Sequence, residues 1–102
     1  MYKLKIMEEA KSSLKSIENY IISEYDNPAA AKRIMVLFRK GFKRVREQPF
    51  SCPVFQSEIS KEHEYRKLIV HNYVVFYTID EERRIVIIAR VFHCKQDYEN
   101  NI

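Results

Sequence analysis

The sequence predicts an α+β fold in which an antiparallel two-helix hairpin covers a twisted four-stranded sheet. Three observations predict it: a short alternating segment opens the chain, two segments with helical periodicity follow, and three strand-like runs occupy the second half. One helical layer on a largely antiparallel sheet buries the apolar face of each. With 102 residues, of which 46% are hydrophobic, we expect one core and one domain over residues 1–102.

The first strand leads directly into the first helix. Alternation in YKLKI, residues 2–6, places Tyr2, Leu4 and Ile6 on one face of a strand. Glu8 and Glu9 follow, where a helix N-terminus favours negative charge. Apolar residues then recur every three or four positions and predict a helix of about four turns. They are Ala10, Leu14, Ile17, Ile21 and Tyr25.

The second helix begins at DNPAA, where Asn27 is a favourable N-cap and Pro28 a favourable first residue. It ends before Pro49, and the short connection to the first helix predicts an antiparallel hairpin. Gly41 falls inside this helix at a cost of about 1 kcal/mol relative to alanine, which close helix packing explains. The apolar face comprises Ala31, Ile34, Met35, Phe38, Phe42 and Val45.

Residues 49–63 contain two prolines and no sustained period, so they predict a loop. The runs YRKLIV, NYVVFYTI and RIVIIARVF are rich in β-branched and aromatic residues and predict three strands. The last run is apolar on both faces, as in a central strand. DEER, residues 80–83, predicts the hairpin turn before it. A hairpin closing symmetrically about that turn would place Arg90 opposite Tyr73.

Composition excludes several function classes. Gly41 is the only glycine, which rules out a glycine-rich phosphate loop. No apolar run approaches the roughly 20 residues of a membrane span, and no secretory core opens the chain, so we expect a cytoplasmic protein. Cys52 and Cys94 are expected to be free thiols. The three histidines lack ligand spacing, so neither a metal nor another cofactor is expected.

The net charge of +4 is unevenly distributed. Residues 27–46 contain none of the 14 acidic residues and seven of the 18 basic ones. The basic residues are Lys32, Arg33, Arg39, Lys40, Lys43, Arg44 and Arg46. They lie on the faces of the second helix that its apolar stripe leaves free, which predicts either a solvated helix face or a surface for an acidic partner.

With these elements placed, the chain resembles toxins of the RelE/ParE superfamily from bacterial type II toxin–antitoxin systems. The resemblance covers the full chain, and it is strongest in YRKLIVHNYVVFYTID followed by IVIIARVFHCKQDY, a pairing similar to the ParE-like branch. It implies a helical hairpin on a twisted antiparallel sheet. It also implies a growth-inhibiting toxin of a plasmid-stabilisation or addiction module, neutralised by a cognate antitoxin.

The resemblance leaves two activities open. ParE-like members inhibit DNA gyrase and block replication, whereas RelE-like members are mRNA interferases that cut mRNA on the ribosome. RNA cleavage needs a group that takes the 2′-hydroxyl proton, cations that hold the phosphate, and a proton donor for the leaving oxygen. RelE-like nucleases have an arginine where this chain has Val74. ParE-like relatives carry two arginines where this chain has Lys95 and Gln96.

If the protein is a metal-independent nuclease, its catalytic candidates are Arg66, Arg90, His93 and Tyr98, with Lys95 binding RNA or another target. Each has a structural alternative. Arg90 would stack on a tyrosine or pair with a carboxylate, His93 would hydrogen-bond the backbone at a strand end, and Tyr98 would anchor the tail. Because this set is incomplete, a binding surface explains it better than an enzyme does. A degenerate toxin that retains only antitoxin binding is a third reading.

The resemblance also directs attention to two partner surfaces. Lys40, Lys43 and Arg44 on the basic second helix are candidates, with Lys95, for binding the target or RNA. An acidic antitoxin tail would also be attracted to this helix. The YRKLIV strand would offer an open sheet edge for strand addition. The sequence leaves the oligomeric state open.

Overall fold

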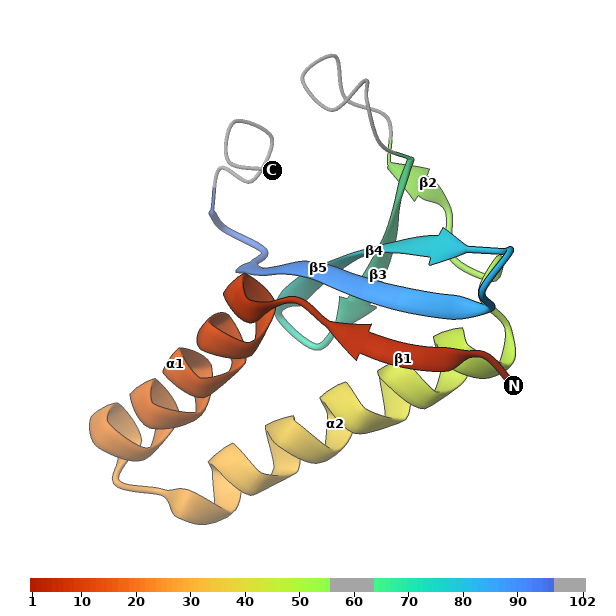
Figure 1. The fold of residues 1–102 in the computed structure, drawn as a ribbon. Coiled ribbons are helices and arrows are strands. Elements are labelled where there is room, and N and C mark those ends of the chain that lie inside the picture. Colours follow the sequence, from red (N-terminus) through yellow and green to blue (C-terminus); the bar gives the residue numbers. More distant parts are fainter. Residues whose placement is uncertain (56–63, 97–102) are drawn as a thin grey trace.

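The structure is a computed structural model that describes residues 1–55 and 64–96. A hairpin of two helices lies below a twisted sheet, and the first strand crosses in front of the second helix (Figure 1). This arrangement confirms the predicted α+β fold. The elements in chain order are β1 (Lys3–Ile6), α1 (Glu8–Tyr25), α2 (Pro28–Glu47), β2 (Val54–Phe55), β3 (Tyr65–Val70), β4 (Tyr73–Asp80) and β5 (Ile85–His93).

The sheet has five strands in the order β1-β5-β4-β3-β2. β1 runs parallel to β5 and the other neighbours are antiparallel. The strand beyond the four expected is β2, whose pairs with β3 in the described residues are Val54–Arg66 and Phe55–Tyr65. Two residues are too few to produce a periodic signal, and Pro53 stands directly before them. β5 lies between β1 and β4, as its apolar pattern on both faces predicted.

The register between β4 and β5 differs from the symmetric closure expected from the sequence. Arg90 lies opposite Phe76, and Tyr73 lies opposite His93, so the expected Arg90–Tyr73 pairing is wrong. Two features displace the strands. The turn occupies residues 81–84 and not 80–83, and the register shifts at a β-bulge between Phe76 and Tyr77.

The helix ends follow the sequence signals. The Asn27 side-chain oxygen accepts a hydrogen bond of 3.1 Å from the Ala30 N–H, and Pro28 opens α2. Between the helices, Asp26 adopts a left-handed conformation with φ 45°, which stops α1 and reverses the chain. The two helices therefore form the expected hairpin.

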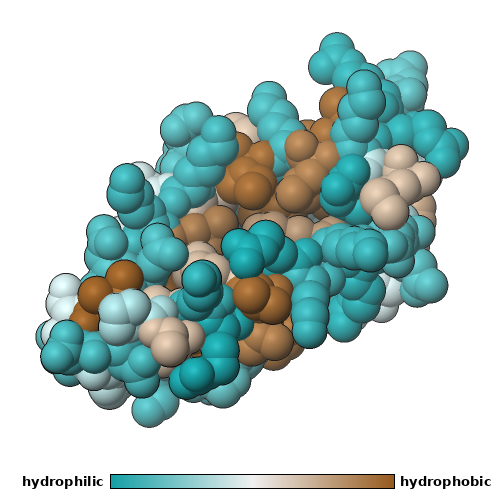
Figure 2. All heavy atoms as spheres, turned by 90° about the horizontal axis from the view of Figure 1, so that it is seen from below, coloured by the Kyte–Doolittle hydropathy of each residue, from teal (hydrophilic) through white to brown (hydrophobic). Residues whose placement is uncertain are grey.

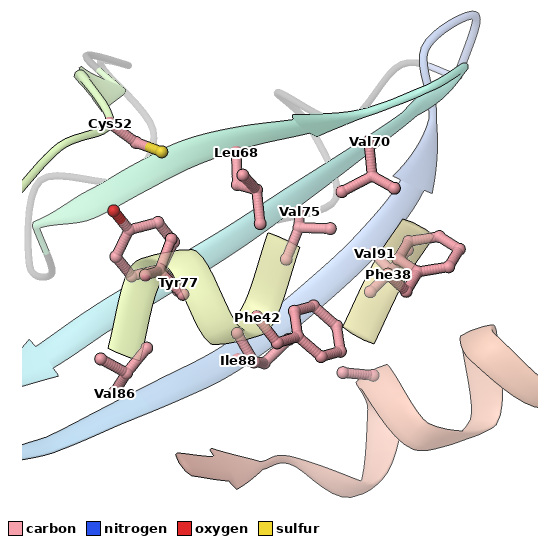
Figure 3. Close-up of a cluster of buried hydrophobic side chains, with 12 residues drawn as sticks. Phe38, Phe42, Cys52, Leu68, Val70, Val75, Tyr77, Val86, Ile88 and Val91 are labelled. Carbon is pink, nitrogen blue, oxygen red and sulfur yellow. The ribbon is translucent and has the colours of Figure 1, made fainter. Parts of the chain in front are cut away.

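The core lies between the helices and the sheet (Figure 3). The buried Val75 and Tyr77 side chains of β4 point toward α2, which contributes Phe38 and Phe42. The Tyr77 hydroxyl donates a 2.7 Å hydrogen bond to the Pro49 carbonyl, and burial raises the pKa of this phenol. Tyr77 thus connects the centre of the sheet to the loop after α2.

Gly41 allows α2 to approach β3 closely. A β-carbon at this position would lie 3.2 Å from Leu68 Cδ2 and 3.2 Å from Val70 Cγ2. Both of those side chains are buried in the core, with 1% and 5% exposure. The close approach accounts for a glycine inside a helix.

Gly41→Val is expected to lower the free energy of unfolding by about 1–3 kcal/mol, because the added methyl groups overpack this contact. Chemical denaturation of the purified protein measures the change. Lys40→Val introduces the same side chain at the neighbouring exposed position and should cost less. Helix propensity alone would make Gly41→Val neutral or slightly stabilising, so a Gly41→Val variant as stable as the original would contradict the close contact.

Candidate functional site

An apolar groove with a basic border runs between α2, α1 and β1. Its volume is about 500 Å³. On the face that carries the two helices, hydrophobic side chains gather near the middle, with hydrophilic ones around them (Figure 2). The apolar lining residues are Met1, Leu4, Ile6, Leu14, Met35, Phe38 and Phe42. The basic lining residues are Arg39, Lys43 and Arg46, all from α2. A segment with apolar and acidic side chains fits this combination.

The basic border follows from the helical period. Arg39, Lys43 and Arg46 recur at spacings of four and three residues, so they lie on one flank of α2, toward the groove. Arg46 also fixes the N-terminal segment, since its Nε donates a 2.9 Å hydrogen bond to the Tyr2 carbonyl. The groove therefore has a defined wall at the end next to β1.

The predicted binding residues divide between two flanks of α2. Lys43 lines the groove and lies 3.9 Å from the Glu47 carboxylate, in an exposed ion pair. Arg44 faces away from the groove, and its guanidinium donates a 3.3 Å hydrogen bond to the Cys52 Sγ. Lys40 is exposed on that same second flank, one helical turn before Arg44. Of the three, only Lys43 contributes to the groove.

In the described residues, the Arg66 side chain contacts the loop after α2. Only 16% of its side chain is exposed. Its Nη1 donates a 2.7 Å hydrogen bond to the Cys52 carbonyl, and its guanidinium lies 5.0 Å from the centre of the Phe50 ring. An ion pair of 3.6 Å joins it to Glu64. These contacts hold the loop after α2 against β3, on the helix-facing side of the sheet.

Arg66→Ala is expected to lower the free energy of unfolding by about 1.5–3 kcal/mol, because the hydrogen bonds to the loop involve a charged donor with little solvent exposure. Thermal or chemical unfolding measures the loss. Arg83→Ala is the matched control, since its guanidinium is 79% exposed and its ion pair to Asp80 spans 3.9 Å. That pair should contribute at most about 1 kcal/mol. A smaller loss for Arg66→Ala than for Arg83→Ala would contradict the structural role.

His93 is the last residue of β5. Its backbone N–H donates a 2.7 Å hydrogen bond to Gln96 Oε1, and its ring Nδ1 accepts a 3.2 Å hydrogen bond from the Lys95 N–H. The ring also packs edge-on against Tyr73, with 5.4 Å between the ring centres. These contacts match the backbone-bonded histidine that the sequence left open as a structural alternative.

Arg90 lies on the opposite side of the sheet from His93 and Arg66. Tyr73 and Tyr77 face the helices, and their partners His93 and Arg66 share that face. Phe76 points to the other face by strand alternation, and Arg90 is its partner. The Arg90 guanidinium lies 3.7 Å from the Glu9 carboxylate, which is the carboxylate pairing considered above. Tyr98 lies outside the described residues.

The outer edge of β3 is only partly covered. Its pairing with β2 ends at Arg66, and the next hydrogen bond runs from the Lys67 N–H to the Pro53 carbonyl, 3.0 Å away. Ile69, farther along β3, is 56% exposed. Within the described residues, no strand lies beside β3 over residues 68–70, so an extended segment could pair there.

The described residues contain neither a candidate metal site nor a membrane-spanning helix. Residues 1–55 and 64–96 contain no group of three histidine, cysteine, aspartate or glutamate side chains arranged to hold a metal ion. In the same part of the chain, no helix is long and apolar enough to cross a membrane.

A groove with an apolar floor and a basic border is the kind of surface that binds an acidic, partly apolar segment of another protein. The protein-family model described as ParE toxin of type II toxin–antitoxin system, parDE, matches residues 4–98. The chain therefore belongs to the ParE toxin family. A search of curated protein sequences finds no match.

Solved structures share the fold at low sequence identity. The chromosomal ParDE toxin–antitoxin system from P. aeruginosa matches with a TM-score of 0.72 and 16% identity, covering 91% of this chain and 96% of the other. The RelBE2 complex from Mycobacterium tuberculosis has a TM-score of 0.58, 19% identity and coverages of 90% and 96%. The E. coli RelBE complex has a TM-score of 0.53, 15% identity and coverages of 94% and 100%. These structures confirm the fold, and the family match confirms the superfamily resemblance and the toxin assignment.

Proposed function

We propose that this toxin stops growth by binding DNA gyrase and blocking replication, and not by cutting mRNA. One observation carries the proposal: the three candidate nuclease residues that the structure describes do not converge. Arg66 and His93 face the helices, whereas Arg90 faces the other side of the sheet. Arg90 and His93 are also three residues apart on β5, about 10 Å along the strand. A phosphate cannot contact all three side chains at once.

Position 74 supports the same conclusion. The resemblance places the main phosphate-binding arginine of RelE-like nucleases there, and this chain has Val74, which is 2% exposed. A buried aliphatic side chain cannot stabilise the charge that builds on a phosphate during cleavage. Arg66, the candidate cation on β3, lies on the other face of the sheet from Val74 and already donates to the Cys52 carbonyl.

Two parallel assays on purified toxin, freed of its antitoxin, test the proposal. The toxin should inhibit supercoiling by DNA gyrase and leave ribosome-bound mRNA intact in primer extension. The toxin with Arg90→Ala should inhibit growth as strongly as the unaltered toxin. Glu9→Gln is the control, because it removes the other partner of the same ion pair. Cleavage in the ribosomal A site that is abolished by His93→Ala together with Arg90→Ala would overturn the proposal in favour of an mRNA interferase.

We further propose that the cognate antitoxin neutralises the toxin by filling the groove between α2, α1 and β1. The apolar floor accepts aliphatic side chains, and the border formed by Arg39, Lys43 and Arg46 attracts carboxylates. An extension of the same antitoxin chain could pair with β3 near Ile69, where the edge is open in the described residues. Co-purification with the product of the adjacent gene at low and high salt tests the pairing. Failure to bind at low salt would exclude it.

A further inference from the structure

A second cavity lies at the free end of the helical hairpin, beside the β3–β4 turn. Its volume is about 730 Å³. In Figure 1 the hairpin extends beyond the sheet on this side, and the β3–β4 turn lies next to α1. Helix residues Ser16, Ile17, Tyr20, Ile21, Tyr25, Ala30 and Ile34 line it, together with His71, Asn72, Tyr73, His93 and Gln96 from the sheet. The cavity thus has aliphatic walls and an aromatic border.

The described residues that line this cavity include no lysine, arginine, aspartate or glutamate, but the helix segment that surrounds it is acidic. Residues 16–31, which form the end of the hairpin, contain Glu18, Glu24 and Asp26 and no lysine or arginine. The body of α2 that follows carries the basic residues of the groove. The hairpin is therefore acidic around its turn, and the basic part of α2 begins at Lys32 and Arg33. Glu18, Glu24 and Asp26 favour a cationic segment near the turn.

Three tyrosines converge on the cavity. Tyr20 and Tyr25 are 55% and 67% exposed, and their rings meet edge-on with 6.3 Å between centres. Tyr25 and then Glu24 raise the pKa of the Tyr20 phenol, because a phenolate would face their negative charge. Burial, followed by Tyr20 and Tyr25, raises the pKa of Tyr73. A positive charge placed among these rings would be stabilised by the aromatic faces and by the Glu24 carboxylate.

We propose that this cavity binds a cationic amphipathic segment of a partner protein, with an arginine or lysine over Tyr20 and Tyr25 and an apolar side chain against Ile17, Ile21 and Ile34. This segment differs in charge from the acidic, partly apolar segment that fits the groove. The toxin's cellular target is the natural candidate, and the proposal holds whichever protein that target is.

Peptide binding to the full chain tests the proposal. One probe is a helical peptide of leucine and arginine, and the matched probe carries glutamate in place of arginine. Amide NMR shifts locate the site and fluorescence anisotropy gives the affinity. The arginine peptide should bind, shift residues that line the cavity, and weaken with salt. The glutamate peptide should leave the cavity unshifted.

Two exposed substitutions probe the site without disturbing the core. Glu24→Lys and Tyr25→Ala should each weaken the arginine peptide by about tenfold, as loss of one partly desolvated cation–aromatic or charge contact predicts. Glu82→Lys makes the same charge change at the exposed β4–β5 turn and should alter affinity by less than about twofold.

Absence of arginine-peptide binding at low salt would overturn the proposal. So would shifts outside the cavity, or an equal loss in Glu82→Lys. Because neither assay contains gyrase or antitoxin, a failure here is separate from a failure of the proposed function.

Discussion

Replacing Arg39 and Lys43 together with glutamate is expected to abolish neutralisation by the antitoxin. Both side chains border the groove, and neither is needed for the core. Like charges facing each other across an interface cost several kcal/mol, so affinity should fall by about a hundredfold or more. Calorimetry on the purified pair measures the affinity, and co-expression in cells shows whether growth inhibition returns.

The matched control is Lys11→Glu with Lys15→Glu. These two residues are exposed on α1, do not line the groove, and give the same change in net charge. Antitoxin affinity in this control should remain within a few-fold of the original. If the control pair weakens binding as much as the groove pair, long-range attraction and not the groove would account for recognition.

Phe38→Ala is expected to cause the largest loss of stability, about 3–5 kcal/mol in the free energy of unfolding. The side chain is 2% exposed and packs against Phe42 and Tyr73, with 6.1 Å and 5.5 Å between ring centres. Truncation removes both aromatic contacts and leaves a void under the sheet. Denaturant titration measures the change.

The same substitution should also lower the affinity for partners at the groove and at the second cavity. Phe38 lines the groove, and its neighbour Tyr73 lines the cavity. Leu37→Ala is the control, since Leu37 is the preceding residue of α2 and is 40% exposed. Its loss should be clearly smaller than that of Phe38→Ala. An equal loss of unfolding free energy in the two variants would contradict the burial of Phe38 in the core.

Most of the fold could be predicted from local patterns. Helical periodicity and the Asn27–Pro28 signal placed both helices, and β-branched runs placed the three long strands. The two-residue β2 and the β-bulge at Phe76 could not be predicted, because each depends on pairing with a strand elsewhere in the chain. The bulge in turn set the position of Arg90 opposite Phe76.

The candidate site was less predictable than the fold. The basic character of α2 was visible in the sequence, but the groove requires three separate elements to leave a space between them. Arg66 resembled a free cation in the sequence, and only the packing of the loop after α2 shows that it is bound there. Glu18, Glu24 and Asp26 were visible in the sequence as an acidic segment. Only the fold shows that this segment borders a cavity lined by three tyrosines.

The parallel pairing of β1 with β5 has a consequence for synthesis of the toxin. Lys3 pairs with Ile85 and Ile6 with Ile88, so the first strand finds its neighbour only after nearly the whole domain has been translated. Contacts so distant in sequence form late and slow folding. If the antitoxin fills the groove as proposed, it can bind only after β5 has left the ribosome, because a shorter nascent chain lacks the ordered groove wall that Leu4 and Ile6 provide.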